Sequence, residues 1–352
     1  MKYPIVVLSY NRPALLRAVL ESLRVQVDAT DDAGVYLFQD GGSEFEGECV
    51  NVFAELFPGG TVMLANKNLG IAENFDRAER FLFEQLKADC AFFFEDDLVL
   101  SPQYLSALHQ LASFALNDPR VGYFAAYGDH RASESEQRAR SREVVRMSHK
   151  WGFGLTRSHW LRQQPIVERY LTIVRKKPYM HRDAVAIRAL FADLGYASAG
   201  TSQDAAKDIA CHVLGATKIM SFACFAKYEG REGMHTRTDF YDKNGWGETV
   251  VLPDIAPDLV MPSGETLDAW VESDRQQARS RVTASSTVVV SGDGCSRQDV
   301  ISAYRFILGR MPENEQVIEG RLGSSVEALR ISLLRSPEFV EKLARLQKKL
   351  DA

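Results

Sequence analysis

The sequence predicts an α/β fold in which helices flank a mostly parallel sheet, followed by a small all-helical module. Over the first 130 residues, short apolar runs alternate with segments of helical periodicity, which is typical of right-handed βαβ units. Polar clusters follow several of these runs. From Asp299 to Leu350 the apolar spacing predicts helices throughout.

Strands are expected at five apolar runs: 4–9 (PIVVLS), 34–38 (GVYLF), 61–65 (TVMLA), 91–95 (AFFFE) and 121–127 (VGYFAAY). Helices are expected from Pro13 onward, across 71–86, and from Ser101 to Ala115. The chain turns polar directly after four of the strands, at 9–12, 40–42, 66–68 and 95–97. Because ligands of parallel sheets bind beyond the carboxyl ends of the strands, these clusters predict a binding site.

Composition shifts indicate the domain boundaries. Residues 131–146 are charged and nearly without apolar side chains, which favours a mobile loop or an exposed helix. Residues 279–296 are rich in Ser, Thr and Gly and are expected as a linker, although the TVVV within them also suits an edge strand. The expected division is a main domain at 1–278, the linker at 279–296 and a helical module at 297–352.

Charge and cysteine content argue against several classes of protein. The net charge of −5 provides no basic stripe for nucleic acid. The five cysteines are an odd number without a C-x-x-C pair, which favours a reduced, cytoplasmic protein over a disulfide framework or a zinc knuckle. No window of about 18 uncharged apolar residues exists, so no transmembrane segment is expected, and peripheral membrane contact stays open.

The stretch CAFFFEDDLVLSPQYL, residues 90–105, places Glu95, Asp96 and Asp97 at the end of a buried strand. Three adjacent carboxylates repel one another, so a cation is needed to offset them. Mn²⁺ or Mg²⁺ suits such oxygen ligands and takes its remaining ligands from phosphate and water. In an extended segment, Glu95 and Asp97 would point one way and Asp96 the other. An exposed acidic turn, or acidic residues that favour the next helix N-terminus, are the alternatives.

Further motifs surround this stretch in the order PIVVLSYNRPALLRAVLESL, QDGG, NLGIAENF, FFFEDDL, HKWGFGLTRSHW and YEGREGMHT. FFFEDDL is similar to the D-x-D-type metal motif of the eukaryotic N-acetylglucosaminyltransferase I family, where it reads E-D-D. The other motifs resemble elements of that family and of bacterial relatives, across residues 3–250. The resemblance implies a GT-A (Rossmann-like) fold and a glycosyltransferase that uses a nucleotide-sugar donor.

The resemblance also implies roles for the matching residues. Asp97 would bind the Mn²⁺ (or Mg²⁺) that bridges the donor diphosphate. His235 would be a second metal ligand or a phosphate contact, with a plain surface position as the alternative. The remaining donor contacts would come from Arg12, Asp40, Asn74, Glu95 and Asp96.

The expected catalytic base lies in the segment TSQDAAKDIACH. In the resembling family an Asp upstream of the late glycine loop takes the acceptor proton, and Asp204 stands at that place, with Asp208 one helical turn later as the competitor. Asp204 is favoured because it lies at the expected helix start. An ordinary helix-terminal charge is the alternative. A base on the opposite face of the sugar implies inversion at the anomeric carbon.

Trp151 and Gly152 in KWGFG are expected to shape the wall of the sugar site. An aromatic face suits sugar C–H groups, and glycine permits close approach of the backbone. A core tryptophan beside a tight turn is an equal alternative. The eukaryotic family lacks the WGFG form, so the donor sugar stays open.

The tail combines Y-R-x-x-L-G-R-x-P with L-x-x-S-P-E-F, here YRFILGRMP and LLRSPEF. This pattern resembles a small bacterial helical domain of unknown function that accompanies polysaccharide-related and secreted proteins. It is expected to serve docking or oligomerisation.

These observations predict a bacterial, metal-dependent, inverting glycosyltransferase of polysaccharide biosynthesis. It would move a hexosyl or N-acetylhexosaminyl group from a UDP-sugar to a glycan or glycolipid hydroxyl. The alternatives are a glycosidase that uses a carboxylate pair, and a non-catalytic nucleotide-sugar-binding module.

Overall fold

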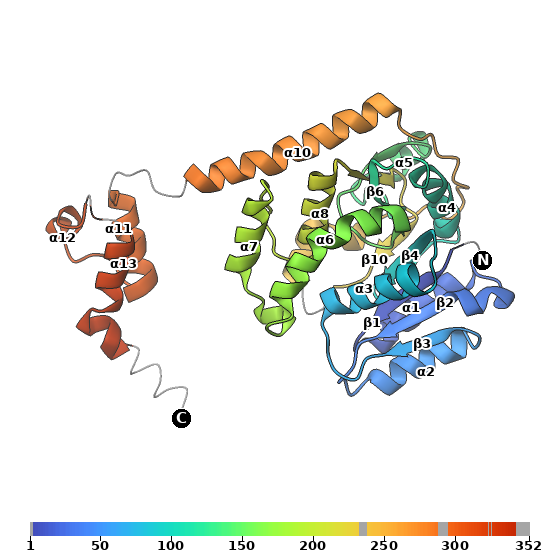
Figure 1. The fold of residues 1–352 in the computed structure, drawn as a ribbon, viewed down its shortest axis with the longest axis horizontal. Helices are drawn as coiled ribbons and strands as arrows, with labels where there is room; N and C mark the ends of the chain where they lie inside the picture. Colours follow the sequence, from blue (N-terminus) through green and yellow to red (C-terminus); the bar gives the residue numbers. More distant parts are fainter. Residues whose placement is uncertain (1–2, 232–237, 288–294, 323, 325, 343–352) are drawn as a thin grey trace. The chain divides into compact units, whose positions relative to one another are not determined.

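The computed structural model describes residues 3–231, 238–287, 295–322, 324 and 326–342 (Figure 1). The chain divides into two compact units, Met1–Val282 and Thr283–Ala352. The described strands all lie in the first unit: β1 (Ile5–Ser9), β2 (Val35–Gln39), β3 (Thr61–Leu64), β4 (Cys90–Glu95), β5 (Leu98–Leu100), β6 (Val121–Ala125), β7 (Val144–Arg146), β8 (Phe153–Thr156), β9 (Thr217–Ser221) and β10 (Ala226–Tyr228).

Helices surround these strands (Figure 1). They are α1 (Pro13–Arg24), α2 (Glu46–Leu56), α3 (Ile71–Arg80), α4 (Tyr104–Ala115), α5 (Glu134–Ala139), α6 (Arg157–Val174), α7 (Ala184–Asp193), α8 (Gln203–Leu214), α9 (Thr238–Asn244) and α10 (Gly264–Thr287). Shorter turns are η1 (Ala29–Gly34), η2 (Phe81–Gln85), η3 (Tyr179–His181) and η4 (Trp246–Glu248).

The main sheet has eight strands in the order β3-β2-β1-β4-β8-β6-β9-β7. Strands β3, β2, β1 and β4 are parallel neighbours, whereas β8 is antiparallel to β4 and to β6. The expected mostly parallel α/β fold is confirmed. Because β1 to β4 are parallel and adjacent, the polar clusters that follow them share one edge of the sheet.

Burial explains why the central elements form where they do. The first five residues of β4, Cys90–Phe94, are all buried between β1 and β8, as expected for a strand covered on both faces. Helix α1 starts at Pro13, whose fixed φ suits a first helical turn, and buries one apolar face. The expected helix at 71–86 forms as α3, followed by the π-helical turn η2. Strand and helix bounds differ from the expected ones by a few residues.

Two expectations for the less regular segments need correction. Residues 131–146 are neither a loop nor one helix, because α5 and the edge strand β7 lie within them. The tail is not helical throughout: α11 (Arg297–Ala303) and η5 (Tyr304–Leu308) end at Gly309, which has a φ of +68°. Short helices α12 (Glu315–Glu319) and α13 (Val326–Leu334) follow.

Helix α10 continues to Thr287, so the segment expected as a linker begins inside a helix. Residues 288–294 of that segment lie outside the described residues. The second unit has its own small apolar cluster around Val300, Tyr304 and Leu333. The division at 278 and 296 stays a prediction.

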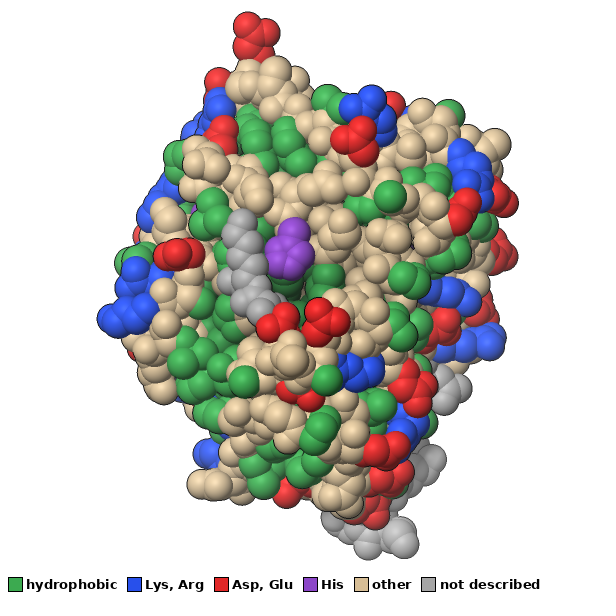
Figure 2. All heavy atoms as spheres, turned by 90° about the vertical axis from the view of Figure 1, so that its right-hand side faces the viewer, with side chains coloured by type: hydrophobic (Ala, Val, Ile, Leu, Met, Phe, Trp, Pro, Cys, Tyr) green, Lys and Arg blue, Asp and Glu red, His purple; other side chains and the backbone are tan. Residues whose placement is uncertain are grey.

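The surface agrees with the mild net charge. On the face shown in Figure 2, basic side chains stand singly or in small groups beside acidic ones. Among the described residues, no helix is long and apolar enough to cross a membrane.

Candidate active site

Arg12 and the carboxylates that follow β4 meet where β1 and β4 end. Arg12 immediately precedes α1, and its guanidinium contacts Asp96 and lies 2.8 Å from Oδ2 of Asp97. Ser9, the last residue of β1, donates from Oγ to Asp96 across 3.4 Å. The two strands thereby bring a cation and a pair of carboxylates into direct contact.

The carboxylates are withdrawn from solvent, with Asp96 only 3% and Asp97 only 6% exposed. Burial raises the pKa of Asp97 to about 6, which Arg12 opposes and Asp96 reinforces. Burial also raises the pKa of Glu95 well above its ordinary value, with added repulsion from Asp97 and Asp204. One guanidinium does not offset this many carboxylates, so the cluster favours a further cation.

The expected alternation of side-chain directions along Glu95–Asp97 is wrong. Strand β4 ends at Glu95, and Asp96 and Asp97 form a turn before β5 begins at Leu98. In this turn both aspartates reach the same partner, Arg12. Both aspartates, and not only one of them, therefore face the segment after β1 that carries Arg12.

Asp40 anchors the backbone at the ends of β2 and β3. It is 4% exposed and accepts hydrogen bonds from the amides of Gly41 (3.0 Å), Leu69 (2.7 Å) and Gly70 (2.9 Å). Gly70 has a φ of +77°, which favours glycine, and α3 begins at the next residue. Both carboxylate oxygens of Asp40 are already used inside the protein.

Asn74, in the first turn of α3, is similarly engaged. Its Nδ2 donates to the carbonyl of Phe38 across 3.0 Å, and its Oδ1 accepts from Arg77 across 2.8 Å. The same Arg77 nitrogen donates to the carbonyls of Gln39 (3.2 Å) and Met63 (3.0 Å). Asn74 and Arg77 thus tie α3 to the ends of β2 and β3.

Arg77 was not singled out by the sequence, because an arginine on an amphipathic helix is expected to face solvent. Its position three residues after Asn74, on the same face of α3, is the signal that could have identified it. It borders a hollow of about 480 Å³ lined by Leu64, Ala65, Asn66, Lys67, Leu69 and Arg77.

Asp204 lies in the first turn of α8. Ser202 caps this helix by accepting from the amide of Ala205 across 3.2 Å, and Oδ1 of Asp204 accepts from Gln203 across 2.7 Å. The charge of Asp204 is near enough to Glu95 to raise the pKa of that carboxyl. The charge of Asp204 therefore lies within electrostatic range of the carboxylates after β4.

Asp208, one turn later, is held by two lysines. Its Oδ1 accepts from Lys150 and, across 2.6 Å, from Lys218. Burial alone would raise the pKa of Asp208, but the two ammonium groups lower it to about 2. A carboxylate stabilised in this way is a poor proton acceptor, which favours Asp204 over Asp208 as a base.

Trp151 belongs to an aromatic stack. Its ring lies between those of His149, 4.7 Å away, and Tyr228, 4.2 Å away and nearly parallel. Gly152 has a φ of +56°, and a Cβ there would lie 2.4 Å from a methyl group of Leu98. Gly152 is thus required for packing, whereas half-buried Trp151 retains some exposed surface.

The chain after β10 passes close to Asp97. The amide of Glu229 donates to the Asp97 carbonyl across 2.8 Å, and a Cβ at Gly230 would lie 2.7 Å from an Asp97 carboxylate oxygen. This is where the late glycine loop begins. Residues 232–237, and with them the expected metal ligand His235, lie outside the described residues.

Comparison with protein families assigns the chain. The family described as glycosyl transferase family 2 matches residues 5–182, just over half of the sequence. The chain belongs to glycosyl transferase family 2. The match includes Arg12, Asp40 and the carboxylates after β4, whereas Asp204 lies beyond it.

Two solved structures resemble this family 2 chain in fold. One is a crystal structure of GalNAc-T7 with UDP, GalNAc and Mn²⁺, at 11% identity and a TM-score of 0.40, covering 94% of this chain and 56% of that one. The other is S. aureus TarS, at 13% identity and a TM-score of 0.36, covering 68% and 45%. The chain thus spans about half the length of these structures. No curated protein matches it.

The carboxylate oxygens of this family 2 site suit a metal ion whose remaining ligands come from a bound phosphate group and water. Among the described residues, no three His, Cys, Asp or Glu side chains form a group that could enclose a metal by themselves. Asp96 and Asp97 offer two buried carboxylates. Mn²⁺ and Mg²⁺ accept that number when phosphate and water complete the shell.

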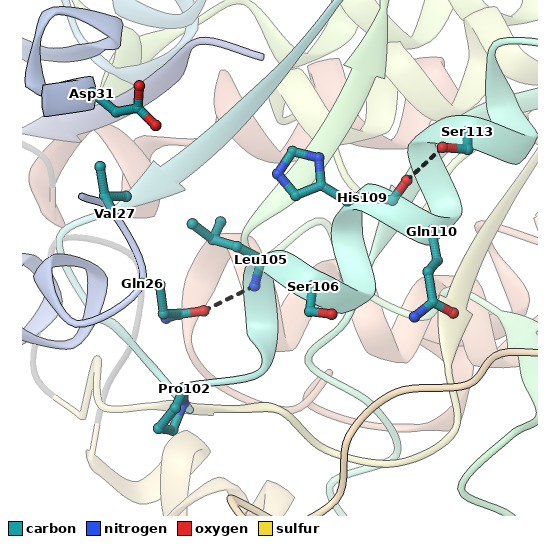
Figure 3. Close-up of a pocket in the computed structure, with 9 residues that line it drawn as sticks. All are labelled: Gln26, Val27, Asp31, Pro102, Leu105, Ser106, His109, Gln110 and Ser113. Carbon is teal, nitrogen blue, oxygen red and sulfur yellow. Dashed lines mark hydrogen bonds between the residues drawn. The ribbon is translucent and has the colours of Figure 1, made fainter. Parts of the chain in front are cut away.

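A second hollow, of about 580 Å³, lies between the end of α1 and α4 (Figure 3). The side chain of Gln26 in it accepts from the amide of Leu105 across 2.9 Å, and His109 stacks on Tyr3. This hollow shares no lining residue with the carboxylate cluster, so it is not part of the candidate active site.

Proposed function

We propose that this family 2 protein is a metal-dependent, inverting transferase that moves a hexosyl or N-acetylhexosaminyl group from a UDP-sugar to a glycan or glycolipid hydroxyl. The contact of Arg12 with Asp96 and Asp97, together with the charge of Asp204 within electrostatic range of Glu95, carries this proposal. It supports one site that combines a cation-binding corner with the Asp204 carboxylate, whose Oδ1 accepts from Gln203. The likeness to the N-acetylglucosaminyltransferase I family remains part of the proposal.

The cation-binding corner would receive the donor diphosphate. A bound Mn²⁺ or Mg²⁺, held by Asp97, would offset the negative charge that grows on the departing diphosphate. Arg12 adds a fixed positive charge at the same corner and keeps Asp96 and Asp97 in place. Glu95 and Asp96 would contact the sugar and ribose hydroxyls.

Asp204 would serve as the base. As the acceptor oxygen attacks the anomeric carbon, its proton passes to the Asp204 carboxylate, and the bond from that carbon to the diphosphate oxygen breaks with its electron pair. Attack from the side opposite the leaving group inverts the configuration. Because Asp208 is neutralised by Lys150 and Lys218, it is left with a structural role.

The proposal revises the expected roles of four residues, namely Asp40, Asn74, Trp151 and Gly152. Asp40 and Asn74 shape the nucleoside side of the site through the backbone that they hold. Trp151, whose ring is stacked between His149 and Tyr228, would offer the edge of that ring to a sugar. Gly152 permits the close packing of the following backbone against Leu98 and Tyr104. His235 stays proposed as a metal or phosphate ligand.

The helical module would serve docking or oligomerisation, and the protein would act in the bacterial cytoplasm. The support for these two points is the sequence pattern of the tail and the odd number of cysteines.

A nucleotide screen followed by a transfer assay tests the proposed function. We expect UDP, and no other nucleoside diphosphate, to raise the melting temperature, and the shift to require Mn²⁺ or Mg²⁺. Asp204→Asn should keep the UDP shift and lose transfer by about 10²-fold or more. Asp208→Asn is the matched variant on the same helix and should retain more transfer. A chain that shows no nucleotide shift, or one in which Asp204→Asn transfers normally, would contradict the proposal.

A further inference from the structure

Residues 175–188, here called the basic turn, form an unusual surface for a chain of net charge −5. The segment reads RKKPYMHRDAVAIR and joins the end of α6 to α7 (Figure 1). It carries one acidic residue, Asp183, against five cations: Arg175, Lys176, Lys177, Arg182 and Arg188.

Several of these cations are not neutralised by neighbours. Arg175 pairs with Glu73, Asp76 and Glu168, and Lys177 is 3.9 Å from Asp183. Among the contacts of the described residues, Lys176 and Arg188 have no carboxylate partner. Arg182 donates to carbonyls instead, including that of Thr201 across 2.9 Å. Lys176 and Arg188 therefore present positive charge to solvent here.

Apolar side chains stand among these charges. Val185, in the first turn of α7, is 77% exposed, and Met180 is 48% exposed. Burying such side chains in water-free surroundings is favourable, and keeping them in water is not. The basic turn thus combines exposed cations with exposed apolar groups, which is the composition of surfaces that lie in the headgroup region of a bilayer.

The basic turn is also held firmly beside the candidate active site. The buried ring of Tyr179 fixes it from within: its hydroxyl accepts from the amide of Gln203 across 3.0 Å, immediately before Asp204. Its Cβ lies 2.8 Å from where a Cβ of Gly70 would be, on the loop anchored by Asp40. The turn therefore touches both the base side and the nucleoside side of the site.

We propose that the basic turn docks the protein on the surface of a bilayer that contains anionic phospholipids. The unpaired cations match the negative headgroups, and Met180 and Val185 enter the boundary below them. A soluble polyanion would satisfy the cations and leave both apolar side chains in water. Docking in this position places the rim of the active site against the membrane, where a lipid-linked acceptor is presented.

Vesicle flotation with the full chain tests the docking. The chain should float with vesicles of phosphatidylcholine and phosphatidylglycerol, and not with phosphatidylcholine alone. The variant Lys176→Glu/Lys177→Glu/Arg188→Glu should lose at least about tenfold in partitioning. The matched variant Lys87→Glu/Arg131→Glu/Lys243→Glu changes the charge equally at other exposed positions and should bind like the unaltered chain. Equal loss in both variants, or equal binding to both vesicle types, would overturn the docking.

A second variant separates the bilayer from a soluble anion. Met180→Ser/Val185→Ser keeps all charges and should weaken flotation, most clearly at high salt, without changing the melting temperature. If this variant floats normally and soluble polyphosphate displaces the protein, the surface binds anions without entering a bilayer and the proposal fails. Flotation needs neither donor nor acceptor, so its outcome is independent of the proposed transferase activity.

Discussion

The Nζ atom of Lys150 donates to the backbone carbonyl of Asp204 across 2.9 Å, 54 residues apart in the sequence. The Lys150 side chain is only 2% exposed, and the same ammonium contacts Asp208. One buried cation therefore joins the segment before β8 to the first turn of α8. Because Asp204 is the proposed base, this contact holds the backbone from which its carboxylate extends.

Replacing Lys150 with Met should reduce kcat and leave the donor KM nearly unchanged. The first turn of α8 would lose its anchor, and a displacement of about 1 Å in a catalytic group can cost 10²-fold in rate. Steady-state kinetics would show the split, and hydrogen exchange across residues 203–211 should rise. Lys218→Met is the matched control, since Lys218 contacts Asp208 but not the Asp204 carbonyl. Equal effects of the two substitutions would assign Lys150 a purely structural role.

Replacing Arg12 with Met should make the protein less stable without metal and more responsive to Mn²⁺ alone. Asp96 and Asp97 would lose their only ion-pair partner among the described residues, at a cost of about 1–3 kcal/mol for uncompensated buried charge. A divalent cation would then meet no competing guanidinium. Thermal shifts with and without Mn²⁺ measure both effects. An Mn²⁺ shift equal to that of the unaltered chain would show that the cation does not bind at this pair.

Gly152→Ala should destabilise the fold by about 2–4 kcal/mol. It adds strain at a φ of +56° and forces a Cβ to 2.4 Å from Leu98 and 2.6 Å from the hydroxyl of Tyr104. Gly195→Ala is the control, because Gly195 has a φ of +83° but no atom within 4 Å of the added carbon. Urea unfolding of both variants separates the two causes. Equal losses would mean that backbone strain, and not packing, explains the glycine at 152.

Stability should fall as the pH drops below 6.5, partly because of His159. This side chain is 2% exposed, and burial lowers its pKa from 6.5 to about 3. Between these values the unfolded chain binds a proton that the folded chain does not, so stability decreases by up to about 1.4 kcal/mol per pH unit. Above pH 6.5 the group contributes nothing to the slope.

Unfolding of His159→Gln between pH 7 and 4.5 should therefore show a shallower decline than the unaltered chain. His181→Gln, at an exposed position in η3, is the matched control. Parallel curves for the two variants would remove His159 from the explanation.

The parallel half of the sheet and its functional edge could be predicted from local pattern. A run such as Ala91–Phe94 favours a strand buried on both faces, and charge directly after such a strand is expected at the end of the sheet. The turn at Asp96 and Asp97 could not be predicted in this way. It exists because the chain leaves the main sheet after Glu95, and β5 pairs instead with β10, which lies more than 120 residues further along the chain.

The contacts that support the site could not be predicted from the local sequence either. Lys150 contacts Asp208, and Arg77 contacts the carbonyls of β2 and β3, only once the sheet has brought these distant segments together. Nothing in the sequence near either cation indicates its partner. Asp40 shows the same limit: the residue was identified, but its bonds to the amides of Leu69 and Gly70 depend on the neighbouring loop.

Through those bonds the single side chain of Asp40 holds two loops in place, the one after β2 and the one after β3. Redesign of nucleotide preference should therefore leave Asp40 unchanged and vary the loop residues around it, because replacing Asp40 would remove the hydrogen bonds that hold both loops. Laboratory evolution that changes the base accepted by this protein should accumulate substitutions at positions 66–69 while Asp40 persists.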